Sequence, residues 1–278
     1  MGQGKPPFLP ADAKLIQVDI EGSEIGRNRK VDVGIVGDAR EILEQMIAEV
    51  ERKPFSHSAW FDSVGPKAKE GADSLMADVP GVDKEEPIHP ARLMQEIRDF
   101  LDDDAIVVAD GGDTQVWTMM GIGVARPAYQ LSSGPFGCLG VGIPYALAAK
   151  LRYPERQVLT TMGDGSAGLN IMEFNTALRF GLPIVMVVSN DCSWGMIRHS
   201  QNAAYGPGRL IGCELGDVAY EKVVEALGGY GERVERAAEI RPALERAFAS
   251  GKPACLNVFT DRAVSTPMGV MLSQLGAV

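Results

Sequence analysis

The chain has 278 residues, enough for one large domain or for one domain and part of another. Apolar residues make up 45% and charged residues 23%, a composition typical of folded globular proteins rather than disordered ones. The net charge of −10 disfavours nucleic acid as a partner, because phosphate binding requires a basic surface. The sequence shows no membrane span, secretory signal or paired cysteine spacing, so we expect a cytoplasmic metabolic protein.

Residues 1–52 carry a strand–strand–helix pattern. Alternating apolar residues predict strands over 14–20 and 31–37. Apolar residues at helical spacing predict a helix over 38–51, with Asp38 as its N-cap. These elements leave apolar faces uncovered, so we expect this segment to be part of a larger central domain. Residues 53–87 lack a period and contain four prolines, which predicts a linker.

Residues 88–278 follow a regular alternation of helices and strands. Continuous apolar runs predict strands at 105–110, 157–162, 183–190 and 253–261. Amphipathic segments predict helices at 89–101, 142–153, 170–181, 218–228 and 239–250. Apolar strands that alternate with helices imply an α/β fold, a doubly wound parallel sheet with helices on both faces.

A glycine-rich turn follows the strand at 157–162. Gly163, Gly165 and Gly168 stand between this strand and a helix expected to begin near Leu169. Free N–H groups at such a turn, with the positive end of a helix, suit a phosphate or diphosphate. The same glycines fit the dinucleotide fingerprint G-x-G-x-x-G. An NAD-dependent dehydrogenase that binds its cofactor at this turn is therefore an alternative.

A carboxylate inside the turn indicates a cation. Asp164 would repel a diphosphate unless a cation lay between them. Asn190 ends the next predicted strand, and if the two strands are neighbours both side chains meet at one edge of the sheet. Oxygen ligands together with diphosphate oxygens are the set that Mg²⁺ prefers. Taken singly, Asp164 is also explained as a helix N-cap and Asn190 as a turn residue, but their spacing favours a metal site.

These motifs resemble those of thiamine diphosphate enzymes. Gly163-Asp164-Gly165-Ser166 and the later Asn190-Asp191 are similar to the GDG…N(N/D) motif of that family. Residues 132–150 resemble the glycine segment that holds the aminopyrimidine ring in the acetolactate synthase and benzaldehyde lyase branch. Residues 111–117 resemble the loop after the first strand of the same domain, and residues 16–39 the closing part of the central domain.

The resemblance implies roles for particular residues. Mg²⁺ would be ligated by the side chains of Asp164 and Asn190 and by the carbonyl oxygen of Cys192. Leu139 would be the apolar wedge that bends the cofactor into its reactive shape. Asp113 departs from the amide seen in relatives. The full set of implied cofactor-binding residues is Asp113, Thr114, Gly137, Cys138, Leu139, Gly163, Asp164, Gly165, Ser166, Asn190, Cys192, Gly195 and Met196.

The segment 190–201 bears on the substrate. Acetolactate synthases usually carry Gln-Trp-Gln where this chain has His199-Ser200-Gln201, whereas benzaldehyde lyase is similar at Trp194-Gly195 and continues with His-Phe-Gln. The resemblance is therefore closer to acyloin or 2-hydroxyacyl-CoA lyases. His199 is a candidate general acid or base, with a surface histidine as the alternative. The catalytic candidates are Leu139, Trp194, His199 and Gln201.

The family generates its reactive cofactor through a glutamate on a pyrimidine-binding domain that precedes the central domain. This sequence begins within the central domain, so the resemblance implies a subunit whose partner supplies that glutamate, or else a fragment of a longer chain. A homo- or hetero-oligomer is expected in either case. The apolar tail at 261–278 is expected to close over the site as a lid or to pack against the missing domain.

The expected function is that of a thiamine diphosphate- and Mg²⁺-binding subunit of a C–C bond lyase or ligase. Its substrate would be a small carbonyl compound, with or without a CoA thioester. An acetolactate synthase large subunit is the alternative within the family. The dehydrogenase is the alternative from another enzyme class, and a non-catalytic homologue is the third alternative.

Overall fold

The computed structural model describes residues 12–53, 56–66, 79–122 and 129–267. It divides into two compact units, Met1–Glu70 and Gly71–Val278, each described here by itself. No helix within the described ranges is long and apolar enough to cross a membrane.

The first unit contains a two-stranded parallel sheet and a helix. Strand β1 (Ile16–Asp19) pairs with β2 (Val33–Val36), with the short helix η1 (Gly22–Glu24) between them, and α1 (Ala39–Arg52) follows. Asp38 caps α1 as predicted, since its carboxylate accepts from the backbone N–H groups of the first turn. Residues 58–66 are also helical, within the segment predicted to be a linker.

Many apolar side chains of the first unit are exposed. Two short strands and the helices of this unit bury little area, so the residues that would form a core stay largely accessible to solvent. They include Ile16, Ile20, Val33, Val36, Leu43, Ile47, Trp60 and Phe61. The assignment of residues 1–52, 53–87 and 88–278 to a partial central domain, a linker and a cofactor domain remains a prediction.

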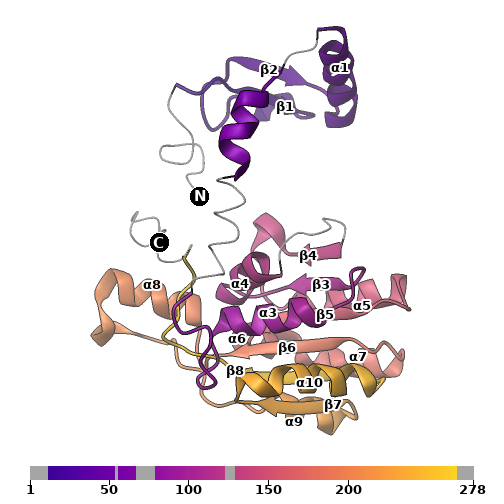
Figure 1. The fold of residues 1–278 in the computed structure, drawn as a ribbon, viewed down its shortest axis with the longest axis vertical. Coiled ribbons are helices and arrows are strands. Elements are labelled where there is room, and N and C mark those ends of the chain that lie inside the picture. The colour runs from indigo at the N-terminus through magenta and orange to yellow at the C-terminus, as the bar shows by residue number, and fades with distance from the viewer. Residues whose placement is uncertain (1–11, 54–55, 67–78, 123–128, 268–278) are drawn as a thin grey trace. The chain divides into compact units, whose positions relative to one another are not determined.

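The second unit is built on a six-stranded parallel sheet in the order β4-β3-β5-β6-β8-β7 (Figure 1). The strands are β3 (Ile106–Ala109), β4 (Gln130–Ser132), β5 (Val158–Gly163), β6 (Val185–Asn190), β7 (Tyr230–Val234) and β8 (Ala254–Phe259). Strands β5 and β6 are neighbours, with Gly163 opposite Ser189. The condition for bringing Asp164 and Asn190 to one edge is therefore met.

Helices cover both faces of this sheet. The helices are α3 (Pro90–Phe100), α4 (Asp113–Gly121), α5 (Gly142–Arg152), α6 (Asp164–Asn170), α7 (Phe174–Arg179), α8 (Gly195–Tyr205), α9 (Tyr220–Leu227) and α10 (Ala237–Ala249), with short 3-10 turns η3 (Gly134–Phe136), η4 (Ile171–Glu173) and η5 (Pro207–Arg209). Residues of α3, α4 and α10 form one buried core with alternate strand residues such as Leu159. Residues of α5, α6, α7 and α9 form a second core with the strand residues of opposite parity, such as Val158. The predicted doubly wound sheet is confirmed.

Most of the predicted elements lie within two residues of their observed bounds, but several expectations were wrong. The single helix expected to begin near Leu169 and to run over 170–181 begins earlier, at Asp164, and is divided into α6, η4 and α7. The segment 111–117, expected as a loop, already enters α4 at Asp113. Strands β4 and β7 were not predicted, because one is a three-residue edge strand and the other is only partly apolar.

Candidate cofactor and metal site at the carboxyl edge of the sheet

Strands β3, β5 and β6 end side by side and place three polar side chains at one edge. Asp110 follows β3, Asp164 follows β5 and Asn190 ends β6. All three are buried, and the exposed fraction of Asp164 is only 3%. Polar side chains gathered at the carboxyl edge of a parallel sheet are typical of a ligand site in this class of fold.

Asp164 has a carboxylate oxygen that lacks a partner. Its Oδ1 accepts a hydrogen bond from Gly165 N at 2.9 Å, while its buried Oδ2 has no partner among the described residues. Burial and the nearby charge of Asp191 raise the pKa of Asp164 to about 7. A buried carboxylate oxygen without a partner is costly, and a bound cation would remove that cost. The residue therefore fits a metal ligand.

Asn190 and Cys192 offer the other two predicted metal ligands. Asn190 Oδ1 accepts from Cys192 N at 2.9 Å, and the Cys192 carbonyl accepts from Leu215 N at 3.0 Å. Each of these oxygens keeps one lone pair free. Cys192 has φ of +57°, a left-handed conformation that is rare for a residue with a side chain and occurs often at functional sites. Burial raises the pKa of the Cys192 thiol, so the thiol stays protonated at neutral pH.

The donor set is that of a hard cation. No group of three His, Cys, Asp or Glu side chains able to hold a metal ion is found within the described part of the chain. The predicted set is of another kind, because it combines one carboxylate with an amide oxygen and a backbone carbonyl. Such oxygens suit Mg²⁺, which takes its remaining ligands from water and phosphate.

The indole of Trp194 packs against the first turn of α6. A Cβ added at Gly165 would lie 2.3 Å from Cζ3 of Trp194, so only glycine allows this approach. The close contact explains a helix that begins with Asp-Gly. It also places Trp194, a predicted catalytic residue, next to the predicted diphosphate-binding backbone.

Gly165→Ala is expected to destabilise the protein by about 1–3 kcal/mol, because the new methyl group displaces Trp194. Urea unfolding and the emission maximum of tryptophan fluorescence measure the two effects. Gly168→Ala on the same helix is the control, since its Cβ would lie 3.8 Å from Tyr220 Oη. Alanine is the better helix former, so that variant should be neutral or slightly stabilised. Equal losses of stability in the two variants would contradict the close packing of Trp194 on Gly165.

Asp110 joins two glycine segments and was missed by the sequence analysis. Its carboxylate accepts backbone hydrogen bonds from Gly111, Gly140 and Gly142, at 2.6, 3.3 and 2.7 Å. Burial raises the pKa of Asp110, although these three donors act in the opposite direction. The signal was present in the sequence. Like Asp164, Asp110 ends a continuous apolar strand and precedes glycine.

The segment after β3 contacts the turn after β5. A Cβ added at Gly111, whose φ is +103°, would lie 3.1 Å from Gly163 N and 3.3 Å from Ser166 Oγ. Thr114 is buried, and its Oγ1 lies 3.4 Å from the position of a Cβ at Gly163. The structure thus brings together Thr114, Gly163 and Ser166, three of the predicted cofactor-binding residues.

Helix α8 reaches the same place through its first residues. A Cβ added at Gly112 would lie 2.9 Å from Cβ of Met196. A Cβ added at Gly195 would lie 2.5 Å from Asp191 Oδ2. Gly195 and Met196 therefore lie beside the segments that follow β3 and β6.

His199 bridges Asp113 and the chain after β8. Its Nδ1 lies 3.0 Å from Asp113 Oδ2, and its Nε2 lies 3.2 Å from the carbonyl oxygen of Arg262. Both partners are acceptors, so both ring nitrogens donate only when the imidazole carries its second proton. The hydrogen bond to Asp113 raises the pKa of His199 despite its burial. His199 is therefore a half-buried side chain held between two acceptors, an arrangement that favours its protonated form, rather than an isolated surface residue.

Asp113→Asn is expected to lower the pKa of His199, because the amide does not stabilise the imidazolium as the carboxylate does. Since the folded pKa is raised, this pair stabilises the fold fully below pH 6.5 and loses its effect as pH rises through the folded pKa. Imidazole proton shifts in an NMR pH titration measure the change. His89, whose pKa is lowered by burial, should titrate as before. An unchanged His199 pKa would contradict the pairing.

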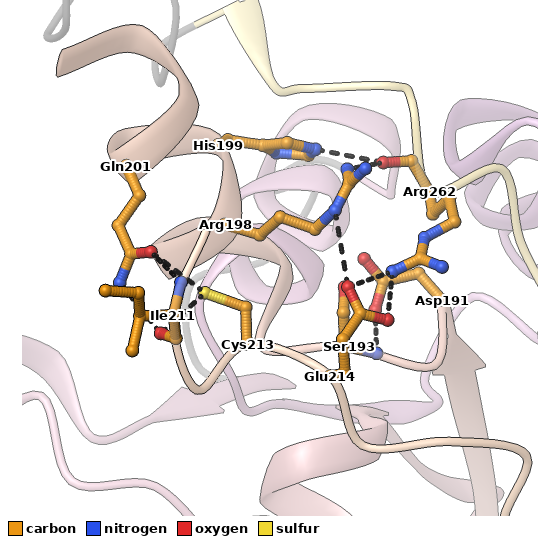
Figure 2. A network of polar contacts seen from close by, with 9 residues as sticks. All are labelled: Asp191, Ser193, Arg198, His199, Gln201, Ile211, Cys213, Glu214 and Arg262. Carbon is orange, nitrogen blue, oxygen red and sulfur yellow. Dashed lines mark hydrogen bonds and ion pairs between the residues drawn. The ribbon is translucent and has the colours of Figure 1, made fainter. Parts of the chain in front are cut away.

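Figure 2 shows that Gln201 and Arg262 take part in structural contacts around α8. Gln201 Oε1 accepts a hydrogen bond from Ile211 N at 2.8 Å, and Gln201 Nε2 donates to the Ile211 carbonyl oxygen at 3.1 Å. The Arg262 guanidinium pairs with both carboxylate oxygens of Glu214. The backbone carbonyl oxygen of Arg262 lies within hydrogen-bond distance of Arg198 and His199. The structure therefore uses Gln201 to hold the chain after α8. Its predicted catalytic role remains a prediction.

Residues 136–139 of the glycine segment are exposed. Phe136 is 88% and Leu139 39% exposed, and Cys138 is also exposed. Gly137 has φ of +61° and ends the turn η3, and Gly140 is anchored to Asp110 and Asn170. Leu139, the predicted wedge, thus lies on an accessible apolar segment attached to the site edge.

The tail is described as far as residue 267. Thr266 Oγ1 lies 3.5 Å from Asp113 Oδ1, so this part of the tail reaches the same carboxylate as His199. Residues 268–278, which hold the rest of the predicted lid, lie outside the described residues.

Comparisons with known proteins identify the family of this chain. The family model "Thiamine pyrophosphate enzyme, C-terminal TPP binding domain" matches residues 110–258, and the central-domain model of the same family matches residues 1–46. The chain is 41% identical over 239 residues to an acetolactate synthase large subunit of Mycobacterium tuberculosis, covering 86% of this chain and 43% of that protein.

A second relative carries a different activity in its name. The chain is 31% identical over 269 residues to a 2-hydroxyacyl-CoA lyase of Arabidopsis thaliana, covering 93% of this chain and 46% of that protein. The chain thus spans less than half the length of these relatives. The buried acidic edge and the match over most of the sheet domain lead to one conclusion: the chain belongs to the thiamine pyrophosphate enzyme family and contains its C-terminal TPP-binding domain.

Proposed function

We propose that this chain binds thiamine diphosphate through Mg²⁺ and forms the cofactor-binding part of a C–C bond lyase or ligase. The observation that carries the proposal is the buried, unpartnered Oδ2 of Asp164 at the end of β5. Asn190 and the Cys192 carbonyl would complete the metal ligands of the protein. The cation would then offset the repulsion between Asp164 and the diphosphate.

Thiamine diphosphate supplies a nucleophilic carbon and an electron sink for cleaving or forming the bond next to a carbonyl. The residues of this chain hold and orient it. Thr114 and the backbone at Gly165 and Ser166 would bind the diphosphate, and Trp194 would exclude water from that end. His199 faces an acceptor at each ring nitrogen, Asp113 and the Arg262 carbonyl, and would hold a proton on the side of the site formed by α8 and the tail.

For the reaction, we infer an acyloin or 2-hydroxyacyl-CoA lyase type. The support is the pairing of His199 with Asp113, which raises the pKa of the imidazole and so favours a proton donor near the site. An acetolactate synthase type is the second candidate, favoured by the 41% identity to proteins of that name. Conversion of pyruvate to acetolactate, measured beside cleavage of an acyloin and of a 2-hydroxyacyl-CoA, distinguishes the two.

We also infer that a further domain, on a partner chain or elsewhere, completes the site with the catalytic glutamate. The exposed apolar segment around Phe136 and Leu139 supports this, because apolar side chains beside a ligand site are normally covered when the site is complete. Native mass spectrometry of the complex purified gently from its source tests it. A second chain, or a longer form of this one, with thiamine diphosphate and magnesium retained is the expected result.

The cofactor itself is tested by thermal unfolding of the chain. Thiamine diphosphate with Mg²⁺ should raise Tm, since a ligand that binds only the folded state stabilises it. EDTA should remove the increase, and NAD should produce none. A Tm increase with NAD that persists in EDTA would instead support the dehydrogenase and refute the proposal.

A further inference from the structure

A buried chain of polar side chains extends from Asn190 into the sheet. Asn190 Nδ2 donates to Asn257 Oδ1 at 2.9 Å, and Asn257 Nδ2 donates to Glu221 Oε2 at 2.8 Å and to the Val218 carbonyl at 3.0 Å. Asn190 and Asn257 are fully buried, and Glu221 is 3% exposed. Asn257 lies on β8, the strand next to β6 in Figure 1, and Glu221 lies on α9.

The donor and acceptor types along this chain allow only one arrangement. The Glu221 carboxylate and the Val218 carbonyl accept hydrogen bonds, so they take both N–H groups of Asn257. The oxygen of Asn257 must then face Asn190. The NH₂ group of Asn190 must point back to it, because the reversed amide would set two oxygens against each other.

This arrangement decides where the Asn190 oxygen points. With its NH₂ group held by Asn257, Oδ1 is directed to Cys192 N, toward the chain that follows β6. Asn190 needs this control because the two ends of an amide differ. Asp164 does not, because either carboxylate oxygen can serve as a ligand.

We propose that Asn257 and Glu221 are positioning residues that hold the Asn190 amide with its oxygen as a metal ligand. The inference rests on the proposed function. Burying these polar groups in an otherwise apolar strand costs free energy, and apolar residues of similar shape would fill the space as well. Hydrogen bonds from this chain of side chains orient the Asn190 amide, as the hydrogen-bond partners of metal-ligating side chains do in metalloproteins.

The test uses the full chain and Mn²⁺ alone as the probe, with the free-ion EPR signal as the measure of binding. Asn257→Leu is expected to weaken Mn²⁺ affinity about 10-fold or more, since the Asn190 amide is then free to turn over. Val258→Ala is the matched control. It lies on the same strand, is buried in the opposite core and should lose stability with unchanged Mn²⁺ affinity.

Asn190→Asp separates positioning from a general loss of structure. A carboxylate presents an oxygen in either orientation, so adding Asn257→Leu to Asn190→Asp should cost no more than about twofold in affinity. An equal loss in both backgrounds would overturn the positioning role, as would wild-type affinity in Asn257→Leu alone. A wild-type chain that binds no Mn²⁺ would instead overturn the proposed metal site and this inference together.

Discussion

Asp164→Asn is expected to abolish Mg²⁺-dependent binding of thiamine diphosphate while stabilising the metal-free protein at pH 8. The amide cannot supply the anionic ligand, so affinity should fall by at least 100-fold, a loss of the order of 3 kcal/mol. The metal-free protein gains because a buried carboxylate, whose Oδ2 lacks a partner among the described residues, is replaced by a neutral group. Titration calorimetry with the cofactor and Mg²⁺, and urea unfolding in EDTA, measure the two effects.

The stability effect of this variant has a defined pH dependence. The folded pKa of Asp164 is about 7 against an ordinary value of 3.8, so the folded state binds the proton more tightly. Protonation of Asp164 therefore contributes to the free energy of unfolding. The contribution is complete below pH 3.8 and is lost as pH rises through 7, so the wild-type protein loses roughly 2–3 kcal/mol of stability between pH 5 and pH 8. Asp164→Asn should lack this loss, and wild type and variant should be alike at pH 5. If Asp164→Asn were less stable than wild type at pH 8, this result would contradict the conclusion that the folded protein holds a charged Asp164 with an unpartnered Oδ2 at that pH.

Asp110→Ala is expected to destabilise the protein by about 3–5 kcal/mol and to disorder the glycine segment that carries Leu139. Three buried backbone N–H groups lose their acceptor, and each unsatisfied donor costs about 1–3 kcal/mol. Gly140 and Gly142 also lose the group that fixes them to the end of β3. Urea unfolding gives the free energy of unfolding, and hydrogen exchange at 137–143 reports the local change.

Asp217→Ala provides the comparison for this effect. Asp217 forms a bidentate pair with Arg233 on the surface, and exposed ion pairs contribute at most about 1 kcal/mol. A loss in Asp110→Ala no greater than in Asp217→Ala would show that water replaces the carboxylate, and that Asp110 does not hold the two segments together.

The sequence by itself determined the sheet domain and which polar residues stand at its carboxyl edge. The strands are continuous apolar runs and the helices are amphipathic, so the period of the apolar residues predicted both types and the burial of both faces. Asp164 and Asn190 were found because each polar residue stands directly after such a run. Parallel strands end at a common edge, so position in the sequence was enough to bring them together.

Only the tertiary structure decided how these residues are held. The pairs Asp113–His199, Asp110–Gly142 and Asn190–Asn257 join positions 32 or more residues apart, and local sequence carries no signal for such contacts. In the sequence Asp110 is only the last residue of a predicted strand. Its role as an acceptor for Gly140 and Gly142 depends on the folding of that glycine segment against it. Helix α6 has a glycine in its first turn because the Trp194 ring packs on Gly165 and leaves no room for a side chain, despite the low helix propensity of glycine. Local patterns fix the elements, whereas hydrogen-bond partners depend on which elements the sheet order makes neighbours.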